Sequence, residues 1–192
     1  MAIILDDVER LDRLITDISD ASRLDAELGR LEVEPIDIGA MLRALADLHE
    51  STRTEGGPHL VVELPDRSRP FVVPGLETRL SQVFRNLIAN AVSFSPPQGE
   101  IRLTARYDGR AVLIAVEDQG PGIPDDKLTT IFDRFYTERP SSEKFGTHSG
   151  LGLSISKQIV EAHRGTIWAE NRRDANGVGI GARFCIRLPA QT

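Results

Sequence analysis

The fold of this 192-residue chain is decided by residues 101–123, which read IRLTARYDGRAVLIAVEDQGPGI. Apolar and polar residues alternate from Ile101 to Tyr107, which predicts a half-buried β-strand. The pair Asp108-Gly109 is typical of a tight hairpin turn. Residues 111–116 are apolar at every position, so we expect a second strand that lies deeper in the same sheet.

The rest of the chain supplies helices and further strands around this hairpin. Apolar residues at helical spacing predict helices over residues 36–54, 76–94 and 151–162. Short apolar runs predict strands over residues 59–64, 70–73, 166–170 and 182–188. We therefore predict an α+β fold, a two-layer α/β sandwich with one mixed sheet and its helices on one face.

The first 29 residues are predicted to be a separate unit from residues 30–192. Between residues 4 and 28 no glycine or proline occurs, and apolar residues follow heptad spacing at Ile4, Val8, Leu11, Ile15 and Ile18. This pattern predicts a long amphipathic helix that needs a partner helix. The alternative is that its apolar stripe packs on the chain's own globular part.

Composition excludes several classes of protein. Apolar residues make up 40% and charged residues 27%, as in ordinary globular domains, and no apolar run approaches the roughly 20 residues of a membrane helix. No secretory signal is evident at the start. A single cysteine, Cys185, cannot form an internal disulfide, which fits a reducing cytoplasm. The net charge of −6 argues against a direct nucleic-acid partner.

Four polar residues share one face of the predicted helix over residues 76–94: Gln82, Asn86, Asn90 and Ser93. Carboxamide oxygens are hard ligands that suit magnesium, and amide nitrogens can donate to phosphate oxygens. Taken by itself, the same row could equally face solvent.

Two glycine-containing segments suggest where a nucleotide could bind. Asp118 follows the buried strand and precedes Gly120 and Gly122, so a flat base could approach the backbone while the carboxylate accepts a hydrogen bond from an exocyclic amine. The segment Gly150-Leu151-Gly152-Leu153 opens the next helix, whose free N–H groups attract phosphate. The alternative for the segment after Asp118 is an ordinary strand-to-helix loop.

Other nucleotide-binding signatures are absent or accidental. The sequence contains no Gly-x-x-x-x-Gly-Lys-Ser/Thr motif, which excludes the P-loop class. Residues 177–182, GVGIGA, match the dinucleotide-binding glycine pattern, but too little chain follows them for the helix and strand that this motif requires. We expect these glycines to begin the last strand instead.

The segments in their order resemble a known family. NLIANA (86–91), DQGPGI (118–123), FDRFYTERP (132–140), GLGL (150–153) and GARF (181–184) are similar to the conserved boxes of histidine kinase catalytic domains. These domains have the Bergerat fold and belong with gyrase, heat-shock protein 90 and MutL. The resemblance covers about residues 31–189, and residues 132–140 and 149–172 look especially like ChvG-type envelope sensor kinases of alphaproteobacteria. Residues 4–28 resemble the second helix of the dimerisation and phosphotransfer hairpin.

The resemblance implies ATP and Mg²⁺ as ligands and assigns roles by position. Asn86 and Asn90 would hold the metal and phosphates, Asp118 would bind the adenine amine, and residues 134–149 would close as a lid. The other residues implied to contact nucleotide are Ser93, Phe94, Gly120, Gly122, Ile123, Arg134, Tyr136, Gly150, Leu151, Gly152 and Leu153.

Two positions depart from the pattern of the family. Many members have Lys-Tyr where this chain has Ser93-Phe94, which removes a cation but keeps an aromatic ring. Gln82 stands where gyrase-like ATPases have a glutamate, and because an amide is a poor base, phosphotransfer is favoured over steady hydrolysis. Gln82 and Asn86 are the candidate catalytic residues.

The phosphoacceptor histidine of a sensor kinase is missing. The histidines are His49, His59, His148 and His163, and none has the required acidic residue and proline after it. The resemblance therefore implies a cytoplasmic fragment of a sensor anchored in the inner membrane, whose partners are its own hairpin, a second protomer and a response regulator. The alternatives are an anti-sigma-type serine kinase and an inactive nucleotide-responsive module.

Overall fold

A computed structural model describes residues 33–65, 70–134, 136 and 150–191 of the chain. The main sheet has five strands in the order β2-β4-β5-β7-β6, and all neighbours are antiparallel except β2 and β4. The strands are β2 (His59–Glu63), β4 (Glu100–Asp108), β5 (Ala111–Glu117), β6 (Thr166–Arg173) and β7 (Gly179–Pro189). The predicted N-terminal helix lies outside the described residues.

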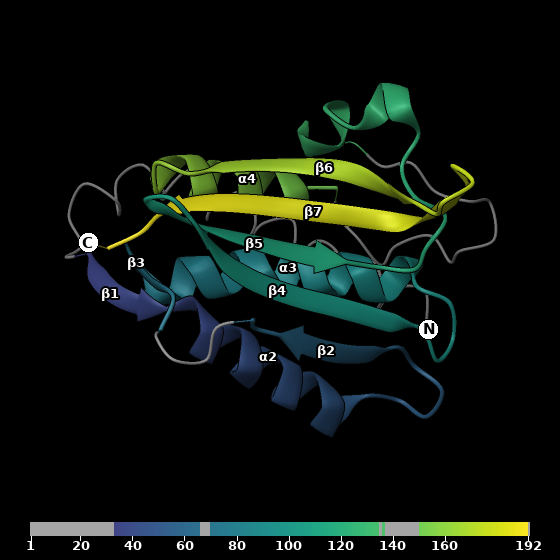
Figure 1. Cartoon of the computed structure of the whole chain (residues 1–192), viewed down its shortest axis with the longest axis horizontal. Helices are drawn as coiled ribbons and strands as arrows, with labels where there is room; N and C mark the ends of the chain where they lie inside the picture. The colour runs from purple at the N-terminus through teal and green to yellow at the C-terminus, as the bar shows by residue number, and fades with distance from the viewer. Residues whose placement is uncertain (1–32, 66–69, 135, 137–149, 192) are drawn as a thin grey trace, which may run out of the picture.

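Three helices lie on one face of this sheet (Figure 1). They are α2 (Ile38–Thr52), α3 (Glu77–Phe94) and α4 (Gly152–Ala162). Two single-turn 3₁₀ helices, η1 (Asp125–Lys127) and η2 (Thr130–Phe132), follow β5. The predicted mixed sheet with helices on one face is confirmed. No helix of the described part is both long and apolar enough to cross a membrane.

The hairpin of β4 and β5 is the centre of the fold, as its sequence predicts. Ile101, Leu103 and Ala105 of β4 are fully buried, while the residues between them are partly exposed. In β5 every residue except Leu113 is buried. Because β5 lies between β4 and β7 under the helices, this strand can be apolar at almost every position.

A second, two-stranded sheet differs from the prediction. β1 (Glu34–Asp37) pairs with β3 (Val72–Gly75), so the strand expected at residues 70–73 lies two residues further on and outside the main sheet. Pro35 and Pro74 are cross-strand partners, and proline, which has no N–H, is tolerated only in such marginal ladders.

Asp37 begins α2 two residues later than predicted, because its carboxylate accepts the N–H of Gly39 at 2.9 Å.

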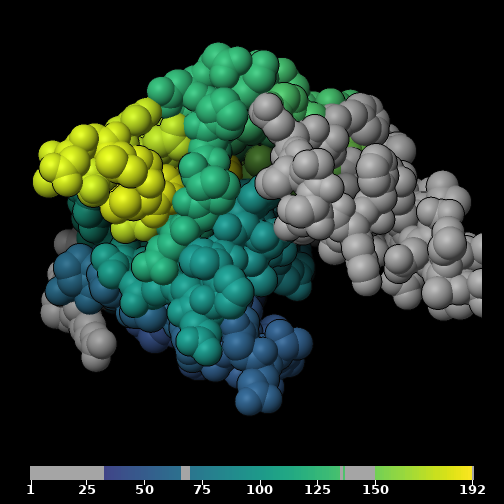
Figure 2. Space-filling model, turned by 90° about the vertical axis from the view of Figure 1, so that its right-hand side faces the viewer, coloured from purple at the N-terminus to yellow at the C-terminus, as the bar shows by residue number. Residues whose placement is uncertain are grey.

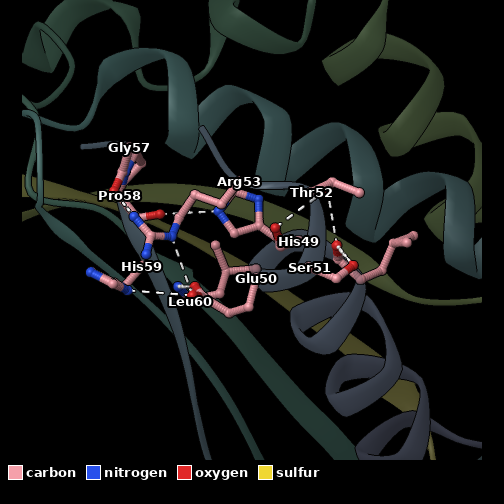
Figure 3. A network of polar contacts seen from close by, with 10 residues as sticks. His49, Glu50, Ser51, Thr52, Arg53, Gly57, Pro58, His59 and Leu60 are labelled. Atoms are coloured by element: carbon pink, nitrogen blue, oxygen red, sulfur yellow. Dashed lines mark hydrogen bonds and ion pairs between the residues drawn. The ribbon is translucent and has the colours of Figure 1, made fainter. Parts of the chain in front are cut away.

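A network of polar contacts joins the end of α2 to the edge strand β2 (Figure 3). Glu50 Oε1 accepts the backbone N–H of Leu60 at 2.9 Å, and its other oxygen lies 3.2 Å from Arg53 Nε. His49 Nε2 lies 3.0 Å from the carbonyl oxygen of Pro58, to which it donates. This contact ties the end of α2 to the residue that precedes β2.

Candidate functional site

The polar face of α3 is built as the sequence predicts. The apolar positions Leu80, Val83, Phe84, Leu87 and Ala91 are fully buried. The candidate site residues on this helix are all half-buried: Gln82, Asn86, Asn90, Ser93 and Phe94. The helix therefore has one face in the core and another that presents amide groups at the edge of the helical layer.

Asn86 connects this face to the beginning of α4. Its Nδ2 donates to the carbonyl oxygen of Gly152 at 3.1 Å and lies 3.4 Å from Ser156 Oγ. Because the amide nitrogen is used in this way, the carboxamide oxygen is the atom left to bind a cation. Within the described residues no group of three or more His, Cys, Asp or Glu could hold a metal ion. The amide oxygens of Asn86 and Asn90 are of the hard type that magnesium prefers.

Gln82 is the weaker of the two catalytic candidates. Its Oε1 accepts a hydrogen bond from Arg79 Nη1 at 3.0 Å. A neutral amide whose oxygen already accepts a hydrogen bond from a guanidinium group is poorly suited to activate water. This contact supports the expectation that Gln82 does not act as an efficient general base.

Asp118 lies at the end of β5 and is only 3% exposed. Its Oδ1 accepts two backbone N–H groups, from Gly120 and Ala182, each at 2.9 Å. Burial raises the pKa of this carboxyl above its usual value, although these two amides and nearby Arg172 act in the opposite direction. Both amide hydrogen bonds go to the same oxygen, so Oδ2 is the atom that can accept from a ligand.

Two glycines allow the backbone to pass close to Asp118. Gly181 of β7 has a φ of 140°, and a Cβ there would collide with the carbonyl oxygen of Asp118. A Cβ on Gly120 would lie 2.7 Å from the carbonyl oxygen of Phe94, at the end of α3. The predicted base-binding residues on α3 and after β5 are therefore brought together by close backbone packing.

Two further residues of this site were missed from the sequence. Asn171 binds both backbone groups of Ile123, and Arg172 Nη1 donates to the carbonyl oxygen of Asp118 at 2.7 Å. Both belong to β6, which extends to Arg173, whereas its apolar pattern predicts a strand that ends at residue 170. Their polar side chains resemble an ordinary loop sequence, so only the strand pairing identifies them.

The structure describes only part of the region that is predicted to bind the phosphates. α4 begins at Gly152, and its N-cap residue, Leu151, makes no side-chain capping hydrogen bond. The backbone N–H groups in the first turn of a helix are where an anion can bind. Gly150, Gly152 and Leu153 are half-buried, Arg134 is exposed, and Tyr136 packs against the core. Residues 137–149, which make up most of the predicted lid, lie outside the described residues.

The segment that follows β5 is accessible at one end of the molecule. Figure 2 views the right-hand end of Figure 1 and shows this green segment on the surface beside the yellow β6–β7 hairpin.

The sequence model of one protein family, the histidine kinase-, DNA gyrase B-, and HSP90-like ATPases, matches this chain. The match covers residues 75–192, from the last residue of β3 to the C-terminus. The matched part contains α3, Asp118 and the start of α4. The chain belongs to this ATPase family. Within it, the chain is a catalytic domain of the histidine kinase type, as its relatives and structural neighbours show.

Two sensor proteins are similar over almost the whole chain. The chain is 48% identical to the sensor protein ChvG of Agrobacterium fabrum over 98% of its length, and 48% identical to ChvG of Rhizobium meliloti over 99%. It covers 32% and 34% of these proteins, so it spans about a third of their length.

Solved histidine kinase structures share the fold of this family member. The catalytic domain of ThkA superimposes with a TM-score of 0.69 at 28% identity, covering 83% of this chain and 96% of ThkA's. Full-length ShkA in complex with AMPPNP gives a TM-score of 0.73 at 29% identity, covering 94% of this chain and 36% of that one. A ThkA structure in complex with the response regulator TrrA has a TM-score of 0.71 at 26% identity, covering 96% of this chain and 49% of that one.

Proposed function

We propose that this domain binds ATP with Mg²⁺ and transfers the γ-phosphate to a histidine of a dimerisation hairpin, for relay to a response regulator. The observation that carries the proposal is the buried carboxylate of Asp118. Two amide hydrogen bonds hold its Oδ1, and its Oδ2 is left to accept the exocyclic amine of adenine. A guanine base presents a carbonyl at that position and would be repelled by the carboxylate.

The phosphates would lie between α3 and α4. Asn86 joins these helices, and its free oxygen together with Asn90 would hold Mg²⁺, which neutralises charge on the phosphates when bound. The N–H groups at the start of α4 would bind phosphate oxygens. Because Gln82 is not a carboxylate, the chain's residues favour transfer to a protein acceptor over hydrolysis.

The proposed partners extend beyond the chain itself. One relative's structure contains a response regulator, and another contains the ATP analogue AMPPNP. By this similarity we propose that residues 1–29 belong to the dimerisation hairpin, that a second protomer completes it, and that the parent protein is a sensor anchored in the inner membrane.

The first test is ATP binding by the unmodified chain, measured by isothermal titration calorimetry with magnesium. Asp118→Ala and Asn90→Ala should each weaken binding by about tenfold or more, since each removes a contact to charged or buried groups worth roughly 1.5–3 kcal/mol. Asn176→Ala, an exposed residue of the β6–β7 turn, is the matched control and should leave the affinity unchanged.

The second test is phosphotransfer to an added acceptor hairpin that contains a histidine. An acid-labile phosphate on that hairpin supports the proposal. An acid-stable phosphate would indicate a serine kinase, and ATP binding without transfer to any acceptor would indicate an interaction module. Absence of ATP binding would contradict the proposed function as a whole.

A further inference from the structure

The loop after β5 is held from both sides by consecutive residues of β6. Successive side chains of a strand point to opposite faces of the sheet. Asn171 lies on the same face as the buried Ala169, and Arg172 lies on the opposite face, where it meets Glu117. The two residues therefore reach the same loop, residues 118–125, from the helix-covered side and the open side.

Asn171 binds the backbone at the far end of this loop through hydrogen bonds like those that a neighbouring β-strand would form. Its Oδ1 accepts the N–H of Ile123 at 2.8 Å, and its Nδ2 donates to the carbonyl oxygen of Ile123 at 2.6 Å. The same Nδ2 also donates to Asp125 Oδ1 at 2.8 Å. A primary amide can form this paired contact because it carries a donor and an acceptor side by side.

The backbone before Ile123 is shaped to admit this amide. Gly122 has a φ of 82°, and a Cβ there would lie 2.8 Å from Asn171 Oδ1. A side chain at this position would thus be strained and would also push the amide away. The second glycine of the DQGPGI segment is needed for contact with Asn171, in addition to any contact with a base.

Arg172 holds the near end of the loop. Its Nη1 donates to the carbonyl oxygen of Asp118 at 2.7 Å, and its Nε lies 3.2 Å from Glu117 Oε2. The Glu117 side chain is 9% exposed, and Arg183 pairs with its other oxygen at 2.7 Å. Arg172 therefore links a nearly buried ion pair to the residue whose carboxylate would face the base.

We infer that Asn171 and Arg172 are positioning residues that set the choice of nucleotide base by fixing the loop between Asp118 and Ile123. This inference deepens the proposed function and rests on it. The two residues act through the orientation of Asp118, because a small displacement of a recognition group can cost a large part of its effect. Their loss should weaken discrimination between bases more than it weakens binding of the shared triphosphate.

The test compares Mg-ATP with the Mg²⁺ complex of purine riboside triphosphate, which lacks the 6-amino group, on the full chain. For Asn171→Ala we expect the Kd of ATP to rise about tenfold, which corresponds to about 1.4 kcal/mol. The Kd of the analogue should change much less, so the ratio of the two constants falls toward one. Arg172→Met should act in the same direction, and Asn176→Ala, on the same hairpin, should leave both constants and their ratio unchanged.

A double variant shows whether the effect passes through Asp118. If it does, adding Asn171→Ala to Asp118→Ala leaves the ratio of the two constants unchanged. Asn171→Ser, which keeps one hydrogen-bonding group, provides the same comparison if Asn171→Ala does not fold.

The outcomes separate this inference from the proposed function. Equal weakening of both nucleotides by Asn171→Ala and Arg172→Met, together with a lower Tm, would show a purely structural role and overturn the inference alone. An unchanged ratio with intact ATP binding would do the same. Failure of the unmodified chain to bind ATP would overturn the proposed function and this inference with it.

Discussion

We expect His163 to contribute several kcal/mol to the free energy of unfolding, because it joins the two helices that carry the candidate site. It follows the last residue of α4, and its Nε2 accepts the N–H of Leu76, the N-cap residue of α3, at 3.0 Å. Its Nδ1 donates to the carbonyl oxygen of Ile159 at 2.7 Å. The ring is buried, 9% exposed, and its Cδ2 would lie 2.8 Å from a Cβ on Gly75. These contacts require the neutral ring with its proton on Nδ1.

The substitution His163→Ala removes both hydrogen bonds and leaves the buried N–H of Leu76 without its acceptor. A net hydrogen bond contributes about 0.5–1.5 kcal/mol, and an unsatisfied buried amide costs about 1–3 kcal/mol. We therefore expect the free energy of unfolding to fall by about 2–4 kcal/mol, measured by urea denaturation at pH 7.5. His59→Ala is the matched control, because the His59 side chain is 50% exposed, and it should cost less than about 0.5 kcal/mol.

The same contacts predict a dependence on pH. Burial lowers the pKa of His163 from its ordinary value of 6.5, so the folded state favours the neutral ring. The unfolded chain binds a proton near pH 6.5 that the folded chain does not, and the stability from His163 is lost as pH falls below that value. The difference in unfolding free energy between the unmodified chain and His163→Ala should shrink by up to about 1.4 kcal/mol per pH unit. A difference that stays constant from about pH 7.5 to 5.5 would refute this reasoning.

Three further predictions concern a close backbone contact at Gly181 and the buried side chains of Cys185 and Asp118. Gly181→Ala should lower the free energy of unfolding by more than about 3 kcal/mol in urea, whereas Gly177→Ala, with open space around it, should cost only about 1 kcal/mol; equal losses would contradict the clash with Asp118. Burial raises the pKa of Cys185 to about 12, so alkylation followed by mass spectrometry at pH 8 should be slow in the folded chain and fast in urea. Because burial raises the pKa of Asp118, ATP affinity should decline on acidification at a higher pH than an exposed carboxylate would give, and calorimetry from about pH 8 to 5 checks this.

The elements of the fold that depend on local pattern could be predicted from the sequence. The alternation in residues 101–107 and the continuous apolar run in residues 111–116 predicted β4 and the more deeply buried β5. The spacing of Gln82, Asn86 and Asn90 predicted a polar face on α3, because residues four apart lie on one side of a helix. The strand β1 was missed, since its four residues contain a proline and pair only with β3.

What the sequence determined by itself was the type of chemistry: amides on a helix, a carboxylate after a buried strand, and glycines where a backbone must come close. Only the tertiary structure decided how these groups are held. Asn171 and His163 lie 48 and 87 residues from the backbone groups that they bind. No local periodicity marks such a partner, because the contact depends on how β6 pairs with β7 and how α4 packs against α3. The sequence thus identifies the groups that could bind a nucleotide, and the packing of distant segments fixes their positions.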